Sequence, residues 1–529
     1  MVIDNVEKRD STETAINNYK CRIEKIKNGG QFSRLGRAFS TTANNYFYDT
    51  GTGKVFQIED NTYKVLRCLS VTNDFDKLFE LPMTSSEVLS ALETIEEAIK
   101  SENILLAPPV KGMEGPQVHQ LKERSQKTTL MTLEVTERCN LRCKYCVYND
   151  HGAYRAFGNK DMSFETAKKA IDYFSEHSDK ELYLSFYGGE PLLKFGLIKQ
   201  CISYAKSVIS KKKKLRFSLT TNATLLTPEI AKYFASIDDF VITVSLDGPE
   251  NIHNENRVYS NGNGSYNDTI KGLKNLIKAT GKNARNLIKI NMVSEYPSIE
   301  KFNQIQDFID STSWLPKGIM ITTNYATHGE IESEPILPDS QMELSMFNKL
   351  EIEFDPLSYW SKHRMKDNNI SLSENTLISN DSITKELSTI HRRMLTDLPM
   401  QIYFMNGCCI PGARRLYVTT DGNFKLCEKI GPAPYLGNVE EGLDLEEVQK
   451  HYVTDFIDEA VKYCSQCWAV NICPLCYTEC YDEKGVHFSY RHVHCMGNRQ
   501  LLEQSLIKYH EILETNPEEL AYLNSIQYK

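Results

Sequence analysis

The sequence predicts an α/β fold in which residues 129–325 form a parallel sheet that closes toward a barrel. Two observations predict it: β-favouring segments alternate with helical patterns, and glycine or polar motifs follow several of the strands. In such folds the chemistry lies at the carboxyl ends of the strands. The predicted strands are 132–136, 182–187, 215–220, 241–246, 288–293 and 318–323, and the predicted helices are 164–176, 195–209, 228–236, 266–279 and 300–311.

The composition limits the class of protein. A chain of 529 residues is too long for one core, so we expect about three domains. Hydrophobic residues at 41% and charged residues at 25% are ordinary for a globular protein. The net charge of -9 argues against a nucleic-acid partner. The sequence shows neither a signal peptide nor an apolar run of 18 residues, so we expect a cytoplasmic protein with no membrane partner.

Fifteen cysteines in a reducing compartment indicate metal or cluster ligation. The first group is CNLRCKYC, with thiols at Cys139, Cys143 and Cys146, directly after the strand predicted at 132–136. Three thiolates at this spacing can ligate three irons of a four-iron cube and leave the fourth iron open. An open iron implies that a substrate or cofactor binds there. A zinc knuckle is the less favoured alternative.

This cysteine loop resembles the radical S-adenosylmethionine (SAM) family. The resemblance implies that SAM fills the open iron site and that an electron from the 4Fe-4S cluster cleaves it to a 5'-deoxyadenosyl radical. Cys139, Cys143 and Cys146 would then be the catalytic cluster ligands. Further positions follow the later strands or lie within the loop, and by the same resemblance we expect them to contact the cofactor: Tyr145, Gly188, Gly189, Glu190, Asn222, Ser245 and Arg257.

These residue types suit the parts of SAM. Two glycines let backbone approach a ligand closely, and the carboxylate of Glu190 can accept hydrogen bonds from an ammonium group. The guanidinium of Arg257 can donate two parallel hydrogen bonds to a carboxylate. The resemblance places Tyr145 near the adenine and gives Ser245 and Arg257 the ribose or carboxylate. The alternatives without cofactor binding are a strand-to-helix turn at the two glycines and a surface position for Arg257.

A second group of cysteines begins near residue 408. An Asp-Gly pair at 421–422 predicts a hairpin that ends on Cys427. The group as a whole comprises Cys408, Cys409, Cys427, Cys464, Cys467, Cys473, Cys476, Cys480 and Cys495. Nine thiols exceed the eight that two closed cubes need. Zinc is the alternative, because two C-x2-C pairs are also a zinc pattern.

This second group resembles the SPASM extension of radical SAM enzymes, which carries two auxiliary 4Fe-4S clusters. The resemblance implies that Cys464, Cys467, Cys473 and Cys495 hold the second auxiliary cluster. Cys409 or Cys408 would begin the first one, together with Cys427. The chain departs from the family pattern after Cys473, which leaves the remaining ligand open between Cys476 and Cys480. Cys21, Cys68 and Cys201 stand apart and are expected to be core or surface residues.

The first 108 residues predict a small α+β unit. A hairpin is expected around 50–53, a helix near 61–69, a helix that begins at the capping box of Thr84, and a short strand at 104–106. The unit resembles the winged-helix-like (RRE-like) domain with which peptide-modifying enzymes hold a leader peptide as an added strand. A purely structural cap is the alternative.

We therefore expect a partial (β/α)6 TIM-like barrel with an N-terminal winged-helix-like domain and a C-terminal SPASM extension. The expected parts are a polar segment (1–40), the leader-binding domain (41–108), a linker (109–128), the radical SAM barrel (129–325), an insertion (326–400), the SPASM domain (401–500) and a C-terminal helix (501–529).

The resemblance implies an enzyme that modifies a ribosomally synthesised precursor peptide, similar to the thioether-forming maturases of the sactipeptide and ranthipeptide type. Its cofactors would be SAM and three 4Fe-4S clusters, and a flavodoxin or ferredoxin would supply electrons. The alternatives are an oxidase similar to anaerobic sulfatase maturases, a peptide epimerase, and a cluster- or zinc-bearing binding protein without catalysis.

Overall fold

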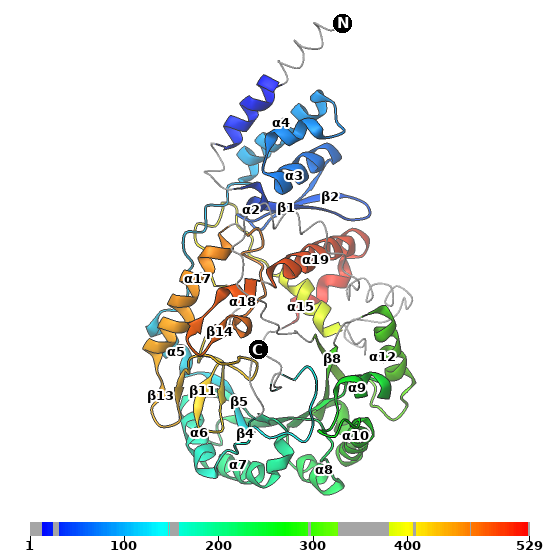
Figure 1. Cartoon of the computed structure of the whole chain (residues 1–529), viewed down its shortest axis with the longest axis vertical. Helices are drawn as coiled ribbons and strands as arrows, with labels where there is room; N and C mark the ends of the chain where they lie inside the picture. Colours follow the sequence, from blue (N-terminus) through cyan, green and yellow to red (C-terminus); the bar gives the residue numbers. More distant parts are fainter. Residues whose placement is uncertain are drawn as a thin grey trace.

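The structure is a computed structural model, which describes residues 13–24, 31–146, 148, 158–294, 298–325, 380–405, 409–465, 467–492 and 494–526. Figure 1 shows the N-terminal unit at one end of the long axis and an arc of strands and helices at the other. The C-terminal helices lie between these two parts.

A central parallel sheet confirms the predicted α/β class. Its six parallel strands follow one another in chain order, which is the order that successive right-handed βα units produce. Each predicted strand coincides with an observed one, with ends displaced by a few residues. The strands are β4 (Thr128–Thr136), β5 (Ser178–Gly188), β6 (Lys214–Thr221), β7 (Phe240–Ser245), β8 (Ile288–Ser294) and β9 (Met320–Tyr325).

The five predicted helices of this region are confirmed, and Figure 1 shows them on the outside of the sheet. They are α6 (Phe164–His177), α7 (Phe195–Val208), α8 (Pro228–Ala235), α10 (Tyr266–Thr280) and α12 (Ile299–Ser311). Two short helices were not predicted, α9 (Glu250–Asn256) and α11 (Ala284–Leu287). Each is seven residues or fewer, which is too short for a helical period to be recognised.

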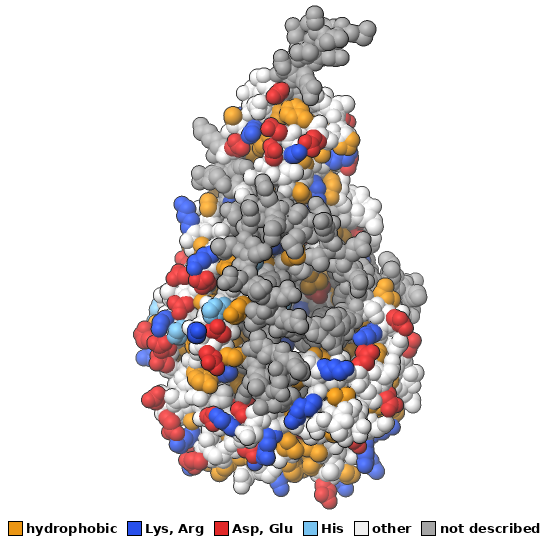
Figure 2. All heavy atoms as spheres, in the orientation of Figure 1, with side chains coloured by type: hydrophobic (Ala, Val, Ile, Leu, Met, Phe, Trp, Pro, Cys, Tyr) orange, Lys and Arg blue, Asp and Glu red, His pale blue; other side chains and the backbone are white. Residues whose placement is uncertain are grey.

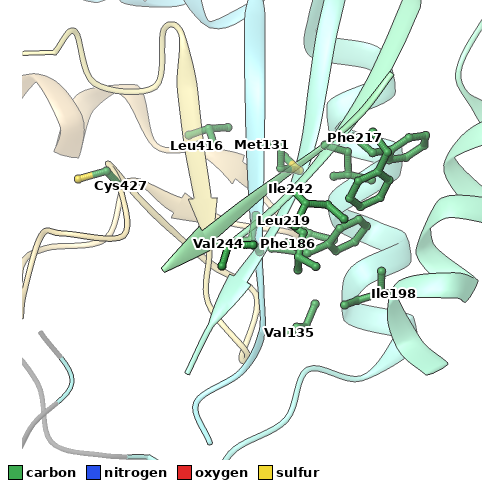
Figure 3. Close-up of a cluster of buried hydrophobic side chains, with 14 of the residues drawn as sticks. Met131, Val135, Phe186, Ile198, Phe217, Leu219, Ile242, Val244, Leu416 and Cys427 are labelled. Carbon is green, nitrogen blue, oxygen red and sulfur yellow. The ribbon is translucent and has the colours of Figure 1, made fainter. Parts of the chain in front are cut away.

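The strands are apolar on one face and polar on the other. Along β5, Leu182, Leu184 and Phe186 are fully buried against the helices, whereas the alternate positions Tyr183 and Tyr187 are only half-buried. Figure 3 shows Phe186 and Leu219 in one cluster with Ile198 of α7. Because successive side chains point to opposite faces, the half-buried positions line the inner face of the arc. The inner face also carries polar side chains, such as Ser185 of β5 and Ser218 and Thr220 of β6.

The hairpin predicted around Asp421–Gly422 is confirmed, and its place in the sheet was not predicted. Strands β10 (Arg415–Val418) and β11 (Asn423–Lys425) are antiparallel, and Gly422 supplies the positive φ of +87° that the turn requires. Strand β10 also pairs in parallel with β4. With β12 (Gly437–Asn438) and β13 (Gly442–Leu443), the sheet has ten strands within the described residues. Figure 3 shows Cys427 at the margin of the apolar cluster to which it belongs.

The N-terminal unit is a three-stranded antiparallel sheet covered by helices. Its elements are a helix at 13–24, α2 (Phe32–Leu35), β1 (Gly36–Ser40), β2 (Asn45–Asp49), β3 (Val55–Ile58), α3 (Asp60–Thr72), the 3-10 helix Phe75–Glu80 and α4 (Ser85–Glu102). The hairpin, both helices and the capping box of Thr84 with Glu87 are confirmed. Strand β1 lies within the segment that the sequence left as polar.

The strand predicted at 104–106 is wrong. Those residues form a turn, and Asn103 and Leu105 both have positive φ, at 59° and 58°. The Leu105 N–H donates a 2.7 Å hydrogen bond to the buried carboxylate of Asp49. This side-chain bond replaces the partner that a strand ladder would have provided. The segment predicted as a linker also contains a helix, α5 (Val118–Ser125).

The C-terminal part joins the two ends of the molecule. It contains α15 (Asn380–His391), α16 (Leu445–Gln449), a π-helical turn (Lys450–Thr454), α17 (Asp455–Cys464), β14 (Tyr481–Asp482), β15 (Gly485–Val486), α18 (Phe488–His492), α19 (Cys495–Thr515) and the 3-10 helix Pro517–Asn524. Helix α19 begins at Cys495, before the predicted start at 501. Figure 1 shows it beneath the N-terminal sheet, where Glu503 pairs with Arg37 of β1.

The outer surface mixes charges of both signs. Figure 2 shows Asp and Glu interspersed with Lys and Arg over the face in view. None of the helices in the described part of the chain is long and apolar enough to cross a membrane.

Candidate functional site

The first cysteine loop lies at the carboxyl end of β4, at the mouth of the barrel. Its backbone is held by the segment that follows α9: the Arg142 N–H donates to the Val258 carbonyl at 2.7 Å, and the Lys144 N–H donates to the Asn256 carbonyl at 3.1 Å. Leu141 also forms an antiparallel bridge with Tyr259. The loop is therefore held by residues more than 110 positions further along the chain. Local sequence patterns could not show such contacts.

Cys139, Cys143 and Cys146 are half-buried thiols that lie near one another. Burial, together with the charges of neighbouring thiolates, raises the pKa of Cys139 and of Cys143 to about 12. Burial also raises the pKa of Cys146. Three thiols whose negative forms repel one another suit a cationic group that would stabilise the thiolates.

A single metal ion and an iron–sulfur cluster require different spacings of their ligands. Among the described residues, no three His, Cys, Asp or Glu side chains are close enough to hold one metal ion. In a cluster each thiolate binds a different iron, so its ligands are farther apart than those of one ion.

Asn222 holds the start of the cysteine loop. It lies at the end of β6, and its Nδ2 donates to Asn140 Oδ1 at 2.9 Å and lies 3.9 Å from Cys139 Sγ. Asn140 in turn donates to Thr224 Oγ1 at 2.8 Å. Asn222 is thus placed next to a cluster thiol, and its amide is engaged by the loop itself.

The glycines and Glu190 also contact the loop rather than open space. A Cβ on Gly188 would lie 2.1 Å from the Thr136 carbonyl oxygen, and one on Gly189 would lie 2.3 Å from the Arg138 carbonyl oxygen. The Gly189 and Glu190 N–H groups donate to these same two carbonyls, at 2.9 and 2.8 Å. The close approach that requires glycine is therefore to the protein backbone beneath the cysteines.

The Glu190 carboxylate is fully buried and bonded within the protein. It accepts hydrogen bonds from Thr221 Oγ1 at 2.7 Å and from the N–H groups of Asn222 and Leu192 at 2.8 and 3.0 Å. Burial raises its pKa, and these hydrogen bonds oppose the rise. Glu190 therefore ties β5 to β6 at the barrel mouth, a structural contribution that sequence reasoning did not consider.

Tyr145 and Arg257 meet at Asp247, which is not among the expected cofactor contacts. Arg257 Nε donates to Asp247 Oδ2 at 2.9 Å, and the Tyr145 hydroxyl donates to the same oxygen. The guanidinium lies 5.4 Å from the Tyr145 ring centre, and its Nη1 is 3.9 Å from Cys143 Sγ. The sequence does mark Asp247, which comes two residues after the end of β7 like the other strand-end motifs, but gives it no expected contact with the cofactor.

Further polar side chains line the inner face of the barrel. Ser245 is buried at the end of β7, next to Asn291 of β8. On the opposite side, the hydroxyls of Tyr148 and Tyr417 lie 2.9 Å apart, and Tyr148 also donates to Glu134 at 3.4 Å. Tyr187 stands edge-on to Tyr417, with ring centres 6.5 Å apart.

Four thiols of the second group share one pocket. Cys464, Cys467, Cys473 and Cys495 line it together with apolar side chains and Arg491. Burial raises the pKa of Cys464 to about 12, and burial together with the other three thiolates raises the pKa of Cys467. Arg491 Nη2 and Asn498 Nδ2 lie 3.6 and 3.7 Å from Cys473 Sγ. N–H donors around grouped sulfurs are what an iron–sulfur cluster needs.

The remaining thiols lie on the β10–β11 side. Burial raises the pKa of Cys427 to about 11, and the charges of both Cys427 and Cys409 act on Arg415 of β10. The Arg415 Nε is buried without a hydrogen-bond partner among the described residues, as expected if a further acceptor binds there. Cys408 lies outside the described residues.

Cys476 and Cys480, the two candidates for the remaining ligand of the first auxiliary cluster, differ in their surroundings. Cys480 is fully buried, and its charge acts on Tyr452 together with that of Cys427. Cys476 is half-buried, with its sulfur 3.1 Å from Thr478 Oγ1. Cys480, Cys427 and Tyr452 belong to the same buried cluster.

Comparisons with known proteins point to one superfamily. A model of the radical SAM superfamily matches residues 133–299. An uncharacterized protein of Methanocaldococcus jannaschii is 41% identical over 143 residues, which are 27% of this chain and 46%, about half, of that protein. The cysteine-type anaerobic sulfatase-maturating enzyme of Clostridium novyi is 24% identical over 404 residues, 74% of this chain and 98% of the enzyme.

A solved structure shares the fold. Native anSMEcpe with bound AdoMet and Kp18Cys peptide is 18% identical, with a TM-score of 0.51, over 76% of this chain and all of that one. A domain of this kind implies that SAM and one 4Fe-4S cluster are cofactors. Residues 133–299, with the cysteine loop at the mouth of the parallel sheet, therefore form a radical SAM superfamily domain within this chain.

Proposed function

We propose that this chain modifies a ribosomally synthesised precursor peptide and forms Cys thioether crosslinks in it. One observation carries the proposal: β4, which leads into the first cysteine group, pairs in parallel with β10, whose hairpin leads to Cys427 of the second group. A substrate at the barrel mouth would therefore be close to both groups of thiols.

The residues fit the cofactors that this proposal requires. Cys139, Cys143 and Cys146 would hold the first 4Fe-4S cluster. SAM would lie beside Tyr145, Asn222, Ser245 and Arg257, whereas Gly188, Gly189 and Glu190 would support the loop beneath it. When bound, these cofactors supply a radical that removes one hydrogen atom from the substrate. The ion pair of Asp247 with Arg257 fixes the guanidinium beside Cys143. From there its N–H groups can donate hydrogen bonds to a carboxylate of the cofactor.

The second cysteine group would hold two auxiliary clusters. We assign Cys464, Cys467, Cys473 and Cys495 to one, and Cys409 (or Cys408), Cys427 and Cys480 to the other. The pocket shared by the first four thiols and the buried Arg415 Nε beside Cys427 support this assignment.

The thioether reaction needs an electron acceptor. One C–H bond and one S–H bond of the peptide break, and one C–S bond forms. One hydrogen leaves as an atom to the SAM-derived radical, and the thiol proton leaves to solvent. The remaining electron goes to an oxidised auxiliary cluster, which is the acceptor that the proposal names. Epimerisation needs a hydrogen donor instead, and so gives less reason for this second group of thiols.

A peptide partner is supported by two features. The related fold of anSMEcpe has been solved with a peptide bound, and the inner face of the barrel carries polar side chains here, which suit a peptide backbone. Strand β3 is also an outer strand of the N-terminal sheet, where a leader peptide could add as a fourth strand.

The test is an anaerobic reaction with the precursor peptide, SAM and a reductant such as flavodoxin or ferredoxin. Mass spectrometry should show the loss of two hydrogens per crosslink and one cysteine that no longer reacts with an alkylating agent. A product of unchanged mass that takes up solvent deuterium would contradict thioether formation and indicate an epimerase.

A second candidate is an oxidase that acts like anaerobic sulfatase maturases. The 24% identity to the C. novyi enzyme over 98% of its length favours it. In that case a peptide with a sulfatase-type cysteine should be oxidised without a leader, and removal of the leader from a precursor peptide should have no effect.

A further inference from the structure

The N-terminal sheet packs directly on the loop between Cys467 and Cys473. Thr50, which follows β2 and is fully buried, donates its hydroxyl to the Trp468 carbonyl at 2.9 Å. Asn471 Nδ2 donates to the Thr50 carbonyl at 2.8 Å. Both Trp468 and Asn471 belong to that loop. The turn after β2 therefore positions the backbone that carries two of the four thiols in the pocket.

Tyr48 reaches the same loop from the end of β2. Its side chain is 0% exposed, and its ring stands edge-on to the Trp468 ring with centres 5.9 Å apart at an angle of 70°. Tyr48 and Trp468 belong to one buried cluster, and Cys467 packs against it. A side chain of the N-terminal sheet is thus placed beside a thiol of the C-terminal pocket.

The Tyr48 hydroxyl has no hydrogen-bond partner in the part of the chain that the structure describes. A buried hydroxyl without an acceptor is unfavourable, because it has lost its water and gained nothing in return. The ring contact with Trp468 and the packing of Cys467 against the same buried cluster place Tyr48 in the neighbourhood of that thiol. Such a donor requires an acceptor that the described side chains do not supply.

We infer that the Tyr48 hydroxyl donates a hydrogen bond to the iron–sulfur cluster held by Cys464, Cys467, Cys473 and Cys495. This inference rests on the proposed function, which assigns a cluster to those thiols. A hydrogen bond to a cluster sulfur stabilises the more negative, reduced form and so raises the reduction potential. The N-terminal sheet would then set the potential of a cluster that belongs to the C-terminal part.

The substitution Tyr48→Phe tests this, because it removes one oxygen and keeps the ring. The measurement is a redox titration followed by electron paramagnetic resonance on the reconstituted full chain. Cys139, Cys143 and Cys146 are replaced by Ala in this background, so that only the auxiliary clusters contribute. We expect unchanged iron content and a more negative potential for one cluster. Full iron content with both potentials unchanged would overturn the inference.

Tyr46→Phe is the matched control. Tyr46 lies on the same strand and the same face, but its hydroxyl donates to Glu514 Oε1 at 2.7 Å and is already satisfied. The potentials should therefore stay at the values of the parent protein. An equal shift in both variants would mean that any change in the N-terminal sheet alters the cluster, and it would contradict a specific bond from Tyr48.

Thermal unfolding separates this role from a structural one. In the cluster-free protein, Tyr48→Phe should be at least as stable as the parent, because the lost hydroxyl had no acceptor. In the reconstituted protein, the same variant should unfold at a lower temperature than the parent. Equal changes in the two forms would show that the hydroxyl does not bond to the cluster.

Cys467→Ser distinguishes the inference from the function on which it rests. If the pocket holds a cluster, this variant should lose about four irons per chain. Unchanged iron would refute the proposed cluster and with it the inference. Loss of iron, combined with unchanged potentials in Tyr48→Phe, would refute the inference alone.

Discussion

Asp247 and Arg257 form a buried ion pair at the mouth of the barrel, with Arg257 Nε 2.9 Å from Asp247 Oδ2. Their side chains are 2% and 8% exposed. Burial disfavours the charged guanidinium, but Asp247 together with the negative forms of Tyr145 and Cys143 outweighs it, and the pKa of Arg257 is raised well above its usual value. Because Asp247 Oδ1 also accepts from the Val293 N–H at 3.0 Å, the pair links the ends of β7 and β8 to the cysteine loop.

Breaking this pair should destabilise the protein. Asp247→Asn leaves a buried arginine without its counter-charge, so we expect the free energy of unfolding to fall by about 3 kcal/mol. SAM affinity should fall as well, because Arg257 is then no longer fixed. Anaerobic urea unfolding and equilibrium binding measure the two effects. Glu123→Gln is the control, because the pair of Glu123 with Lys127 is exposed and screened by solvent, so its loss should leave unfolding nearly unchanged.

The three cysteines of the first group should be required for SAM cleavage. Replacing Cys139, Cys143 and Cys146 with Ala should abolish formation of 5'-deoxyadenosine, because the cluster that donates the electron then has no ligands. The iron held by the second cysteine group should remain. Chromatography of the reaction products and an iron assay measure both. A variant that still cleaves SAM would refute the assignment.

The second cysteine group predicts a specific iron content. Anaerobically reconstituted protein should contain about twelve irons per chain, four for each of three cubes. If the second group binds zinc instead, iron should be about four per chain and zinc should be present in stoichiometric amount. Metal analysis by mass spectrometry decides between these outcomes.

Leader binding can be tested on the edge strand β3. The N–H groups of neighbouring residues in a strand point in opposite directions, so one of Phe56 and Gln57 directs its N–H outward. Of the variants Phe56→Pro and Gln57→Pro, one should weaken peptide binding about tenfold with little change in stability. The other should lose a bond to β2 and destabilise the sheet.

Fluorescence anisotropy with a labelled leader peptide measures this binding. If both variants bind the peptide as the parent protein does, strand addition at β3 is wrong. Substitution at this edge is a cleaner test than deletion of the N-terminal sheet, because that sheet packs on Trp468 and deletion would disturb the second pocket.

His510 should make the junction of the N-terminal sheet with α19 sensitive to acid. Its ring lies 5.2 Å from that of Phe39 and 4.9 Å from that of Tyr46, and burial lowers its pKa from 6.5 to about 4. Between pH 6.5 and pH 4 the unfolded chain binds the proton and the folded chain does not. Its contribution to stability is therefore full above pH 6.5 and is lost as the pH falls toward 4.

From pH 7 to pH 5 this loss amounts to about 2 kcal/mol. His510→Phe keeps an aromatic ring and removes the titration, so its free energy of unfolding should fall by about 2 kcal/mol less than that of the parent over this interval. Urea unfolding at the two pH values measures the difference. Identical pH dependence in parent and variant would contradict a neutral buried His510.

The barrel could be predicted from the sequence because its signals are local. Strands such as β5 show a period of two, and helices such as α4 begin at a capping box, so short windows identify them. The cysteine spacing from Cys139 to Cys146 lies within one loop, and it indicates a cluster without reference to distant residues. The turn at Gly422 is predictable for the same reason, since its positive φ is a property of one residue.

Long-range contacts decided the rest. The sequence could not show that β10 pairs with β4 or that Asp247 joins Tyr145 to Arg257. Nor could it show that the Glu190 carboxylate accepts hydrogen bonds from Thr221 and Asn222.

The sequence by itself thus determined the elements and the chemistry of the cysteine loop, since both depend on neighbours along the chain. Only the tertiary structure brought Tyr48 to Trp468, which are 420 residues apart. Such contacts depend on how whole elements pack, and no local pattern of residues records that packing.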